Sequence, residues 1–276
     1  MQMNANQVSK HEVADFWDDN PCGSFASTEP RGEKRFYEDV AKFRYAVQPF
    51  MRPLIGFHTY PGKRVLEVGC GLGTDLLQFS LAGSSVVGVD LSANSVALAS
   101  KHLNVFGAQG NLLASDAEHL PFADESFDVV YSFGVLHHTP NTSSAIDECW
   151  RVLKPGGRFI LMLYNRNSWQ VAIEPYVLAV KRRLLRQTLP NRVTDKAEVV
   201  RRYDGVENPL GKAYTPAEMR EMLRRFVDVR LRIRHPLIVN GALIGRIYSR
   251  FLELSGINRR WGFWIMAEGE RPAQTV

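Results

Sequence analysis

Three glycines at alternate positions, Gly69, Gly71 and Gly73, follow the short, mostly apolar run from Arg64 to Val68. Apolar runs of this kind are typical of strands buried on both faces of a parallel sheet. The glycines let the chain turn sharply, and because they carry no Cβ they leave the main chain open to a ligand. Glu67 interrupts the apolar run just before the turn, where its carboxylate could reach amine or hydroxyl groups of a ligand. The segment therefore predicts a nucleotide-like cofactor.

The spacing of the glycines separates several kinds of nucleotide-binding loop. A dinucleotide fingerprint, G-x-G-x-x-G, needs a third glycine where this chain has Thr74, and Gly73 comes one residue too early. A phosphate-binding P-loop needs G-K-[ST] after the glycines, and none follows. An NAD(P)-dependent oxidoreductase, which shares the strand and the glycine loop, stays an alternative that this spacing disfavours.

A second acid stands where the next expected strand ends. The run from Ser85 to Val89 leads to Asp90, and Leu91 and Ser92 open the helix that follows. Dinucleotide-binding folds place a ribose-binding acid at about this distance from the glycines, and its carboxylate accepts from the hydroxyls. Asp90 could instead cap the helix, but Ser92 is also suited to that role. We therefore favour ribose binding by Asp90.

Several segments in order resemble the class I S-adenosylmethionine (SAM) methyltransferases. The glycine segment from Glu67 to Asp75 resembles their motif I, and Leu153 to Leu161, with its Pro-Gly-Gly turn, resembles their motif III. Between them, L-P-F-A-D-E-S-F-D-V-V from Leu120 to Val130 is typical of methyltransferases similar to the ubiquinone/menaquinone and sterol C-methyltransferases. With the acids after the second and third strands, the resemblance covers Arg64 to about Tyr164.

The resemblance implies SAM as cofactor, with S-adenosylhomocysteine (SAH) as product. It also implies an α/β fold: a doubly wound, seven-stranded, mostly parallel, Rossmann-like sheet. In this family an acid after the third strand bonds the adenine amino group, a position that Asp116 matches, while the backbone of its neighbour meets the ring. An acid in such a turn also occurs without a ligand. Cofactor contacts are expected from Glu67, Gly69, Cys70, Gly71, Gly73, Asp90, Leu91, Asp116, Ala117 and Phe133.

The chain divides into four expected parts. Residues 1–60 form an N-terminal helical lid, 61–165 the SAM-binding core, 166–212 a helical insertion that caps the substrate, and 213–276 the C-terminal part of the sheet. Four aromatic residues could line the substrate side of the lid or pack as ordinary core: Phe16, Trp17, Phe36 and Tyr37. The expected elements outside the motifs are helices over His11–Trp17, Glu33–Phe50, Thr215–Phe226 and Gly241–Leu254, a strand over Val227–Ile233, and a last, antiparallel strand over Trp261–Ala267.

Charge and composition limit the partners. The 276 residues carry a net charge of +5, concentrated in the C-terminal half with a cluster at Lys181–Arg183. Such a face can attract nucleic acid, anionic lipid or an acidic substrate, and the basic insertion allows peripheral membrane contact, but a solvated surface is the commoner explanation. Three scattered cysteines predict neither disulfides nor a zinc site. A polar start and no apolar run of about 18 residues predict a cytoplasmic protein.

Two histidines follow the fourth expected strand. His137 and His138 lie after Phe133, at the edge where open α/β sheets bind ligands. Imidazole has a suitable pKa for accepting a proton from a methyl acceptor, so the pair is the candidate general base, with His138 ahead of His137. One of the two could instead hold the loop or contact the methionine part of SAM. The sulfonium already activates the methyl group, so transfer is expected to need no metal.

The acceptor is expected to be a small or lipid-like organic molecule. Amino-methyltransferases of nucleic acids carry [D/N/S]-P-P-[Y/F/W] after the fourth strand, where this chain has Phe133-Gly134-Val135-Leu136, so base flipping is disfavoured. The resemblance slightly favours carbon or oxygen as the methylated atom. A SAM-binding regulatory protein without transfer activity is a second alternative. The oligomeric state is left open.

Overall fold

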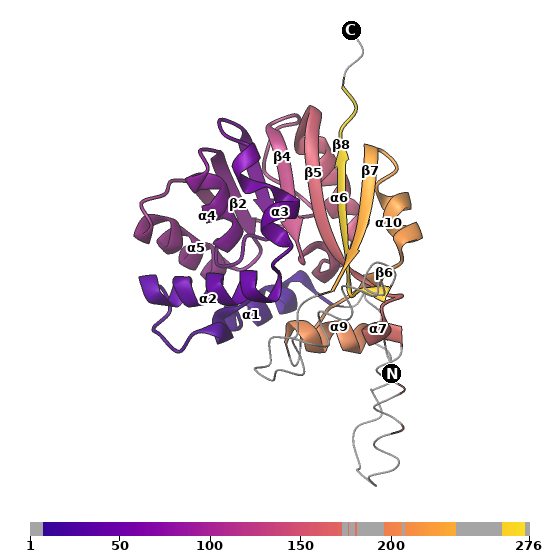
Figure 1. Cartoon of the computed structure of the whole chain (residues 1–276), viewed down its shortest axis with the longest axis horizontal. Coiled ribbons are helices and arrows are strands. Elements are labelled where there is room, and N and C mark those ends of the chain that lie inside the picture. The colour runs from indigo at the N-terminus through magenta and orange to yellow at the C-terminus, as the bar shows by residue number, and fades with distance from the viewer. Residues whose placement is uncertain are drawn as a thin grey trace.

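The computed structural model describes residues 8–172, 176, 180, 196–205, 208–235 and 261–273. Its centre is one sheet with the strand order β3-β2-β1-β4-β5-β8-β7, and a short β6 pairs with β5 (Figure 1). The strands are β1 (Arg64–Val68), β2 (Ser85–Asp90), β3 (Asn111–Ala114), β4 (Phe127–Phe133), β5 (Leu153–Asn165), β6 (Ala213–Tyr214), β7 (Val227–Arg234) and β8 (Trp264–Glu270).

The pairing confirms the expected fold. The strands β1 to β6 pair in parallel, whereas β8 runs antiparallel between β5 and β7. The described sheet has one strand more than the seven predicted, because Ala213 and Tyr214 pair with the end of β5 over two residues. A stretch that short carries no periodicity from which a strand could be recognised.

Helices cover both faces of the sheet and form two separate cores. Successive strand residues point to opposite faces, so Val65 joins one core and Leu66 the other. The near-continuous apolar run of β1 reflects this burial on both sides. The helices are α1 (Lys10–Asp19), α2 (Lys34–Val47), α3 (Met51–Ile55), α4 (Thr74–Leu81), α5 (Ala93–Val105), α6 (Thr142–Val152), α7 (Trp169–Ala172), α9 (Lys196–Asp204) and α10 (Pro216–Met222), with 3-10 turns at Ser24–Ala26, Phe57–Thr59 and Leu136–His138.

The N-terminal segment lies along the edge where the parallel strands end (Figure 1). Helix α1 begins at a capping box of Ser9 and Glu12. The helix expected over Glu33–Phe50 is two, because α2 ends at Val47 and α3 starts at Met51. Phe36 and Tyr37 pack in a small core with Val40 and Leu72, and unlike those two they do not line the pocket described below. Of the four lid aromatics, these two are therefore core residues.

The C-terminal part supplies the antiparallel end of the sheet. Helix α10 starts as predicted, with Thr215 and Glu218 forming a capping box and Pro216 at the first position. The predicted helix over 241–254 and the Lys181–Arg183 cluster lie outside the described residues. Within the described part, no helix combines the length and apolarity needed to cross a bilayer.

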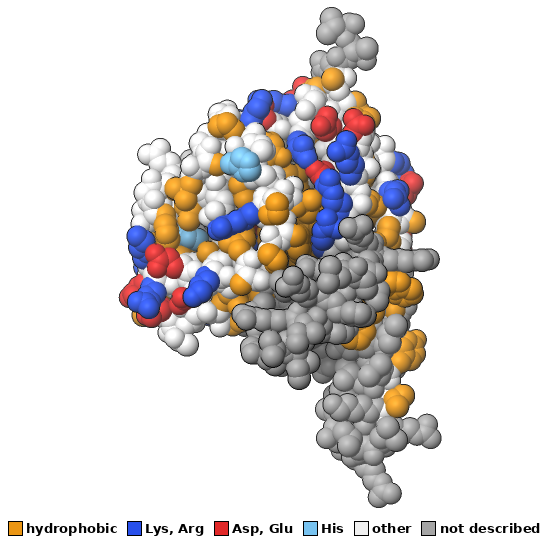
Figure 2. All heavy atoms as spheres, viewed as in Figure 1, with side chains coloured by type: hydrophobic (Ala, Val, Ile, Leu, Met, Phe, Trp, Pro, Cys, Tyr) orange, Lys and Arg blue, Asp and Glu red, His pale blue; other side chains and the backbone are white. Residues whose placement is uncertain are grey.

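Basic side chains gather over the β7–β8 side of the sheet (Figure 2). Strand β7 carries Arg230, Arg232 and Arg234 at alternate positions, which places them on one face. Arg232 forms an ion pair with Glu268 on the neighbouring strand. Local pairing of this kind fits a solvated surface better than a nucleic-acid footprint.

Candidate active site

A cavity of about 530 Å³ opens at the carboxyl ends of β1, β2 and β4. Parallel α/β sheets commonly bind ligands at this edge, and the volume is that of a typical small-molecule site. Its walls come from the N-terminal segment, the loops after the strands, the end of α9, and side chains of β5 and β8. Of the predicted cofactor residues the cavity is lined by Glu67, Gly69, Cys70, Gly71, Asp90, Leu91, Asp116, Ala117 and Phe133, while Gly73 lies behind it against α5.

The glycine loop has the backbone that its sequence predicts. Gly69, Gly71 and Gly73 all have positive φ angles, of 79°, 51° and 72°. A Cβ at Gly69 would lie 2.2 Å from a methyl of Val135, and one at Gly73 would lie 3.0 Å from the Cβ of Ala99. At Gly71 a Cβ would meet no atom within 4 Å. Two of the glycines thus permit close packing, and the third leaves open space beside the main chain for a ligand.

Asp90 is held by the loop that it faces. One carboxylate oxygen accepts from the amide of Gly71 at 2.8 Å, and the other accepts from the amide of Ser92 at 3.0 Å. Burial raises the pKa of Asp90, and these amides partly oppose the rise. The Ser92 hydroxyl caps α5 by accepting from Ser95, so Asp90 is not the cap. Each oxygen keeps a further lone pair, which a ligand hydroxyl can use.

Asp116 and Glu118 follow β3 and are tied to the first helix. The ammonium of Lys10 lies 2.5 Å from a carboxylate oxygen of Asp116 and 2.8 Å from one of Glu118. Burial opposes ionisation of both acids, but the hydrogen bonds from Lys10 and from local donors hold the pKa of each below its usual range. The sequence offered no signal for Lys10, a single cation in a polar segment. This contact fastens α1 over one end of the cavity.

A buried charge cluster adjoins the glycine loop. Arg44 on α2 donates two hydrogen bonds to Asp75, which also accepts from Tyr45 and Tyr131. The Arg44 guanidinium stacks 5.0 Å from the ring centre of Phe133. Glu67 is 4 % exposed, and its Oε2 has no hydrogen-bond partner among the residues that the structure describes.

Burial, reinforced by the neighbouring charge of Asp75, raises the pKa of Glu67 well above its usual range. A buried acid with an unmet acceptor beside an open cavity is arranged to receive a ligand donor. Arg44 and Glu67 both line the cavity, so it presents a cation and an acid side by side. Sequence reasoning identified Glu67 but not Arg44, because nothing in the α2 pattern sets Arg44 apart from the other basic residues of that helix.

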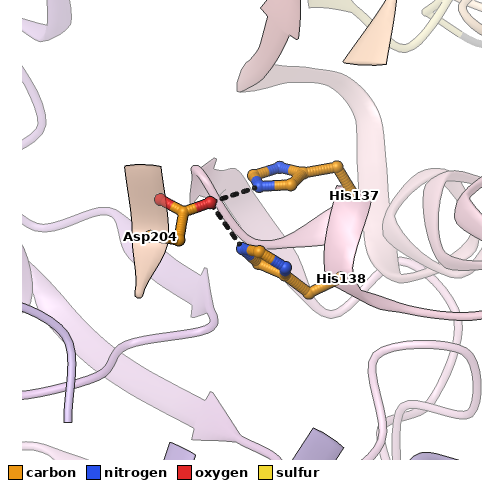
Figure 3. Close-up of side chains that lie close together, drawn as sticks. All are labelled: His137, His138 and Asp204. Carbon is orange, nitrogen blue, oxygen red and sulfur yellow. Dashed lines mark hydrogen bonds and ion pairs between the residues drawn. The ribbon is translucent and has the colours of Figure 1, made fainter. Parts of the chain in front are cut away.

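Two histidines and one aspartate meet at the other end of the cavity (Figure 3). Asp204, the last residue of α9, places Oδ2 3.4 Å from His137 Nε2 and 3.1 Å from His138 Nε2. His138 and Asp204 line the cavity, whereas His137 is fully buried behind them. Burial, together with the adjacent His138, lowers the pKa of His137 to about 3. Asp204 stays ionised: burial opposes its charge, but the two imidazoles hold its pKa at about 2.

Aromatic side chains surround this cluster. The Trp17 ring packs edge-on against His138 with ring centres 5.1 Å apart, and Tyr164 donates a hydrogen bond to Asp204. Of the four lid aromatics, Trp17 therefore lines the cavity, whereas Phe16 contacts Trp17 from outside it. The remaining aromatic residues of the lining are Phe25, Phe43, Phe133, Tyr203 and Trp264. One end of the cavity is thus polar and the other is largely aromatic.

Comparison with known proteins decides the family. Residues 66–161 match the methyltransferase domain family. A ubiquinone biosynthesis O-methyltransferase from Rhizobium rhizogenes is 30 % identical over 229 residues, which cover 79 % of this chain and 88 % of the relative. One from Pseudomonas putida is 32 % identical over 185 residues, covering 63 % and 78 %.

The chain is a SAM-dependent methyltransferase. Its cofactor is SAM, and it is an enzyme of the family that the sequence motifs predicted.

Solved structures agree on the fold. Magnesium protoporphyrin IX methyltransferase from Synechocystis PCC 6803, with bound SAH, has a TM-score of 0.58 and 17 % identity, covering 95 % of this methyltransferase and all of that chain. A SAM-dependent methyltransferase from Methanosarcina mazei has a TM-score of 0.56 and 20 % identity, covering 80 % and 98 %. At such identities the likeness concerns the fold alone.

Proposed function

We propose that this methyltransferase methylates a hydroxyl oxygen on a small, largely aromatic or lipid-like acceptor. The observation that carries the proposal is that His138 and Asp204 line the same cavity as the glycine loop. A group able to take up a proton therefore shares one chamber with the cofactor residues. The aromatic walls at that end suit an apolar acceptor, because they exclude water and stack against a ring.

The polar end of the cavity is the place that we assign to SAM. Asp90 would accept from the ribose hydroxyls, and Asp116 from the adenine amino group, with Leu91 and Ala117 against the base. Gly71 leaves room for the ligand beside its main chain. Glu67 and Arg44 present an acid and a guanidinium that suit the ammonium and the carboxylate of the methionine part. With these contacts each acid of the cavity would face a hydrogen-bond donor of SAM, and Arg44 would face the SAM carboxylate.

The chemistry divides between cofactor and protein. SAM supplies a methyl group already activated on a sulfonium. The protein has to align the acceptor, exclude water and promote loss of the hydroxyl proton. His138 donates from Nδ1 to the carbonyl of Leu210 at 2.5 Å, which leaves a lone pair on Nε2, the nitrogen beside Asp204. A proton taken up at Nε2 would be stabilised by that carboxylate. His137, which is buried behind them, is a positioning residue.

The relatives support oxygen over carbon as the methylated atom. Those from Pseudomonas putida and Rhizobium rhizogenes are both named as O-methyltransferases of ubiquinone biosynthesis. A hydroxyl must lose a proton in the transfer, and a proton-accepting cluster meets that need. C-methylation at a ring carbon is the second candidate, since the same cavity could hold a phenolate that reacts at carbon.

The test begins with calorimetric titration of the purified protein with SAH, and with NAD as a control. Methyl transfer from labelled SAM to catechols and hydroquinones, with and without prenyl chains, is then measured, and the methylated atom is located by NMR. We expect SAH binding and an O-methyl product, and His138→Gln to lower kcat on the order of 100-fold with SAH affinity unchanged. A C-methyl product, or a kcat that does not respond to His138→Gln, would contradict the proposal.

A further inference from the structure

The His137–His138–Asp204 cluster has a feature that a proton acceptor alone does not require. His138 Nε2 lies 3.1 Å from Asp204 Oδ2, a contact that is an ion pair only when the imidazole is protonated. Nε2 has no hydrogen-bond partner in the described part of the chain. Because Nδ1 donates to Leu210, a neutral His138 points an unshared lone pair toward a region beside a carboxylate. Two sets of lone pairs side by side in a buried place are stabilised by a positive charge, which a proton on Nε2 or a metal ion between the two groups can supply.

We propose that His137, His138 and Asp204 bind one divalent transition-metal ion at the acceptor end of the cavity. Their ligand atoms, one from each residue, all lie within 4.8 Å of one another. Atoms that share a cation at about 2.0–2.1 Å lie about 3.0 to 3.4 Å apart in octahedral and tetrahedral sites. The two nitrogen–oxygen separations, 3.4 and 3.1 Å, are in that range.

The residues around the cluster hold the ligand atoms in place. The Leu210 carbonyl fixes the tautomer and the ring orientation of His138, which is the usual outer contact of a metal-binding histidine. Tyr164 donates to Oδ1 of Asp204, so Oδ2 is the oxygen turned toward both imidazoles. His137 would bind through Nε2, the nitrogen that faces Asp204, and its Nδ1 has no hydrogen-bond partner within the described residues, so only His138 has an outer contact of this kind.

The ligand set indicates the class of ion. Two imidazoles and one carboxylate suit Zn²⁺, Co²⁺ or Fe²⁺, whereas Mg²⁺ and Ca²⁺ prefer oxygen ligands. Three protein ligands leave at least one position open, which is typical of catalytic rather than structural sites. His138 and Asp204 line the cavity, so the open position would face the acceptor.

The charges of such a site suit the acceptor of the proposed function. Two neutral imidazoles and one carboxylate leave a divalent ion with one net positive charge, which an ionised hydroxyl would neutralise. The ion would lower the pKa of that hydroxyl and fix its position, so that the hydroxyl loses its proton to solvent before transfer and His138 acts as a ligand in place of a proton acceptor. This consequence rests on the proposed function, whereas binding of the ion does not.

The experiment uses untagged, full-length protein freed of metal with a chelator and titrated with Co²⁺ and, separately, Zn²⁺. We expect one equivalent to bind at micromolar concentration or below, with visible Co²⁺ absorption bands typical of nitrogen and oxygen ligands. His138→Gln and Asp204→Asn should each weaken binding on the order of 100-fold or more. His58→Ala, which removes an exposed histidine of the 3-10 turn before β1, should change nothing.

Two controls separate the outcomes. Titration of every variant with SAH reports whether the cofactor end is still folded. The wild-type Co²⁺ spectrum needs no variant, and addition of a catechol should shift its bands. Absence of Co²⁺ and Zn²⁺ binding, or equal affinity in wild type and His138→Gln, would overturn the metal site and leave His138 as a proton acceptor. Metal binding without methyl transfer would instead contradict the proposed function alone.

Discussion

The two ends of the cavity are built in different ways. At the cofactor end, the residues from Glu67 to Ala117 follow one another along β1, β2 and β3, and each lies where a strand ends. At the acceptor end, Trp17 comes from α1, His138 from the turn after β4, and Asp204 from α9. His137 and Asp204 are 67 positions apart in the chain, whereas the residues of the glycine loop are close neighbours in sequence.

This difference predicts how each end responds to change. The cofactor end depends on backbone geometry, so substitutions there should affect both SAH binding and stability. The acceptor end depends on contacts between helices that pack on the sheet from outside. Substitutions there should alter turnover and leave SAH affinity nearly constant.

Gly69→Ala should have the largest effect. The new Cβ would meet Val135 at 2.2 Å in a left-handed backbone conformation, which we expect to cost about 3 kcal/mol or more of unfolding free energy. Gly107→Ala is the matched control, with φ of 67° and no atom within 4 Å of the new Cβ, and should cost about 1–2 kcal/mol. Urea unfolding and SAH titration measure both. Equal losses of unfolding free energy in the two variants would show that close packing against Val135 is not the reason for a glycine at position 69.

Asp90→Ala should lower SAH affinity on the order of 100-fold, because hydrogen bonds to a charged group contribute about 1.5–3 kcal/mol. Stability should change less, since Ser92 itself caps α5. Asp128→Asn removes an acid at the opposite end of the sheet, bonded to Arg64 and Lys154, and should leave SAH affinity unchanged. Calorimetry compares the two. Unchanged affinity in Asp90→Ala would refute the ribose assignment.

Trp17→Ala tests the acceptor end. Loss of its contact with His138 should raise KM for the acceptor about 10-fold, or about 1.4 kcal/mol, with SAH affinity changed less than about 3-fold. Trp17→Phe keeps an aromatic ring at the site and should recover most of the loss. Steady-state kinetics with calorimetry separates the two ends. A large loss of SAH affinity would mean that Trp17 belongs to the cofactor end.

Lys10→Met should have the smallest effect, because the ion pairs of Lys10 are partly exposed and such pairs contribute about 1 kcal/mol or less. The folded-state pKa values of Asp116 and Glu118 are lowered, so the stabilisation is present at neutral pH and is lost as pH falls below about 4. Urea unfolding at pH 7 and pH 3 should show the variant less stable only at pH 7. Lys42→Met, which replaces an exposed lysine on α2, is the control. An equal loss of stability in Lys10→Met at both pH values would contradict the ion-pair explanation.

Most of the cofactor end could be read from the sequence. The positions of Glu67, Gly71, Asp90 and Asp116 follow from strand ends, and parallel strands bring their carboxyl ends to one edge. Arg44 and Lys10 could not be foreseen, because they reach the cavity from helices whose packing leaves no local pattern. The role of Phe36 and Tyr37 could not be predicted either, because their spacing suits a lid as well as a core.

The family, the sheet and the glycine loop follow from the amino-acid sequence alone, because they depend on local backbone preferences and on the period of apolar residues. Two features appear only in the folded chain: Asp204 joins His137 and His138, and Trp17 rather than Phe36 lines the cavity. Such contacts depend on how α1 and α9 pack against the sheet. That packing is set by the sum of many small apolar contacts, which no short segment records.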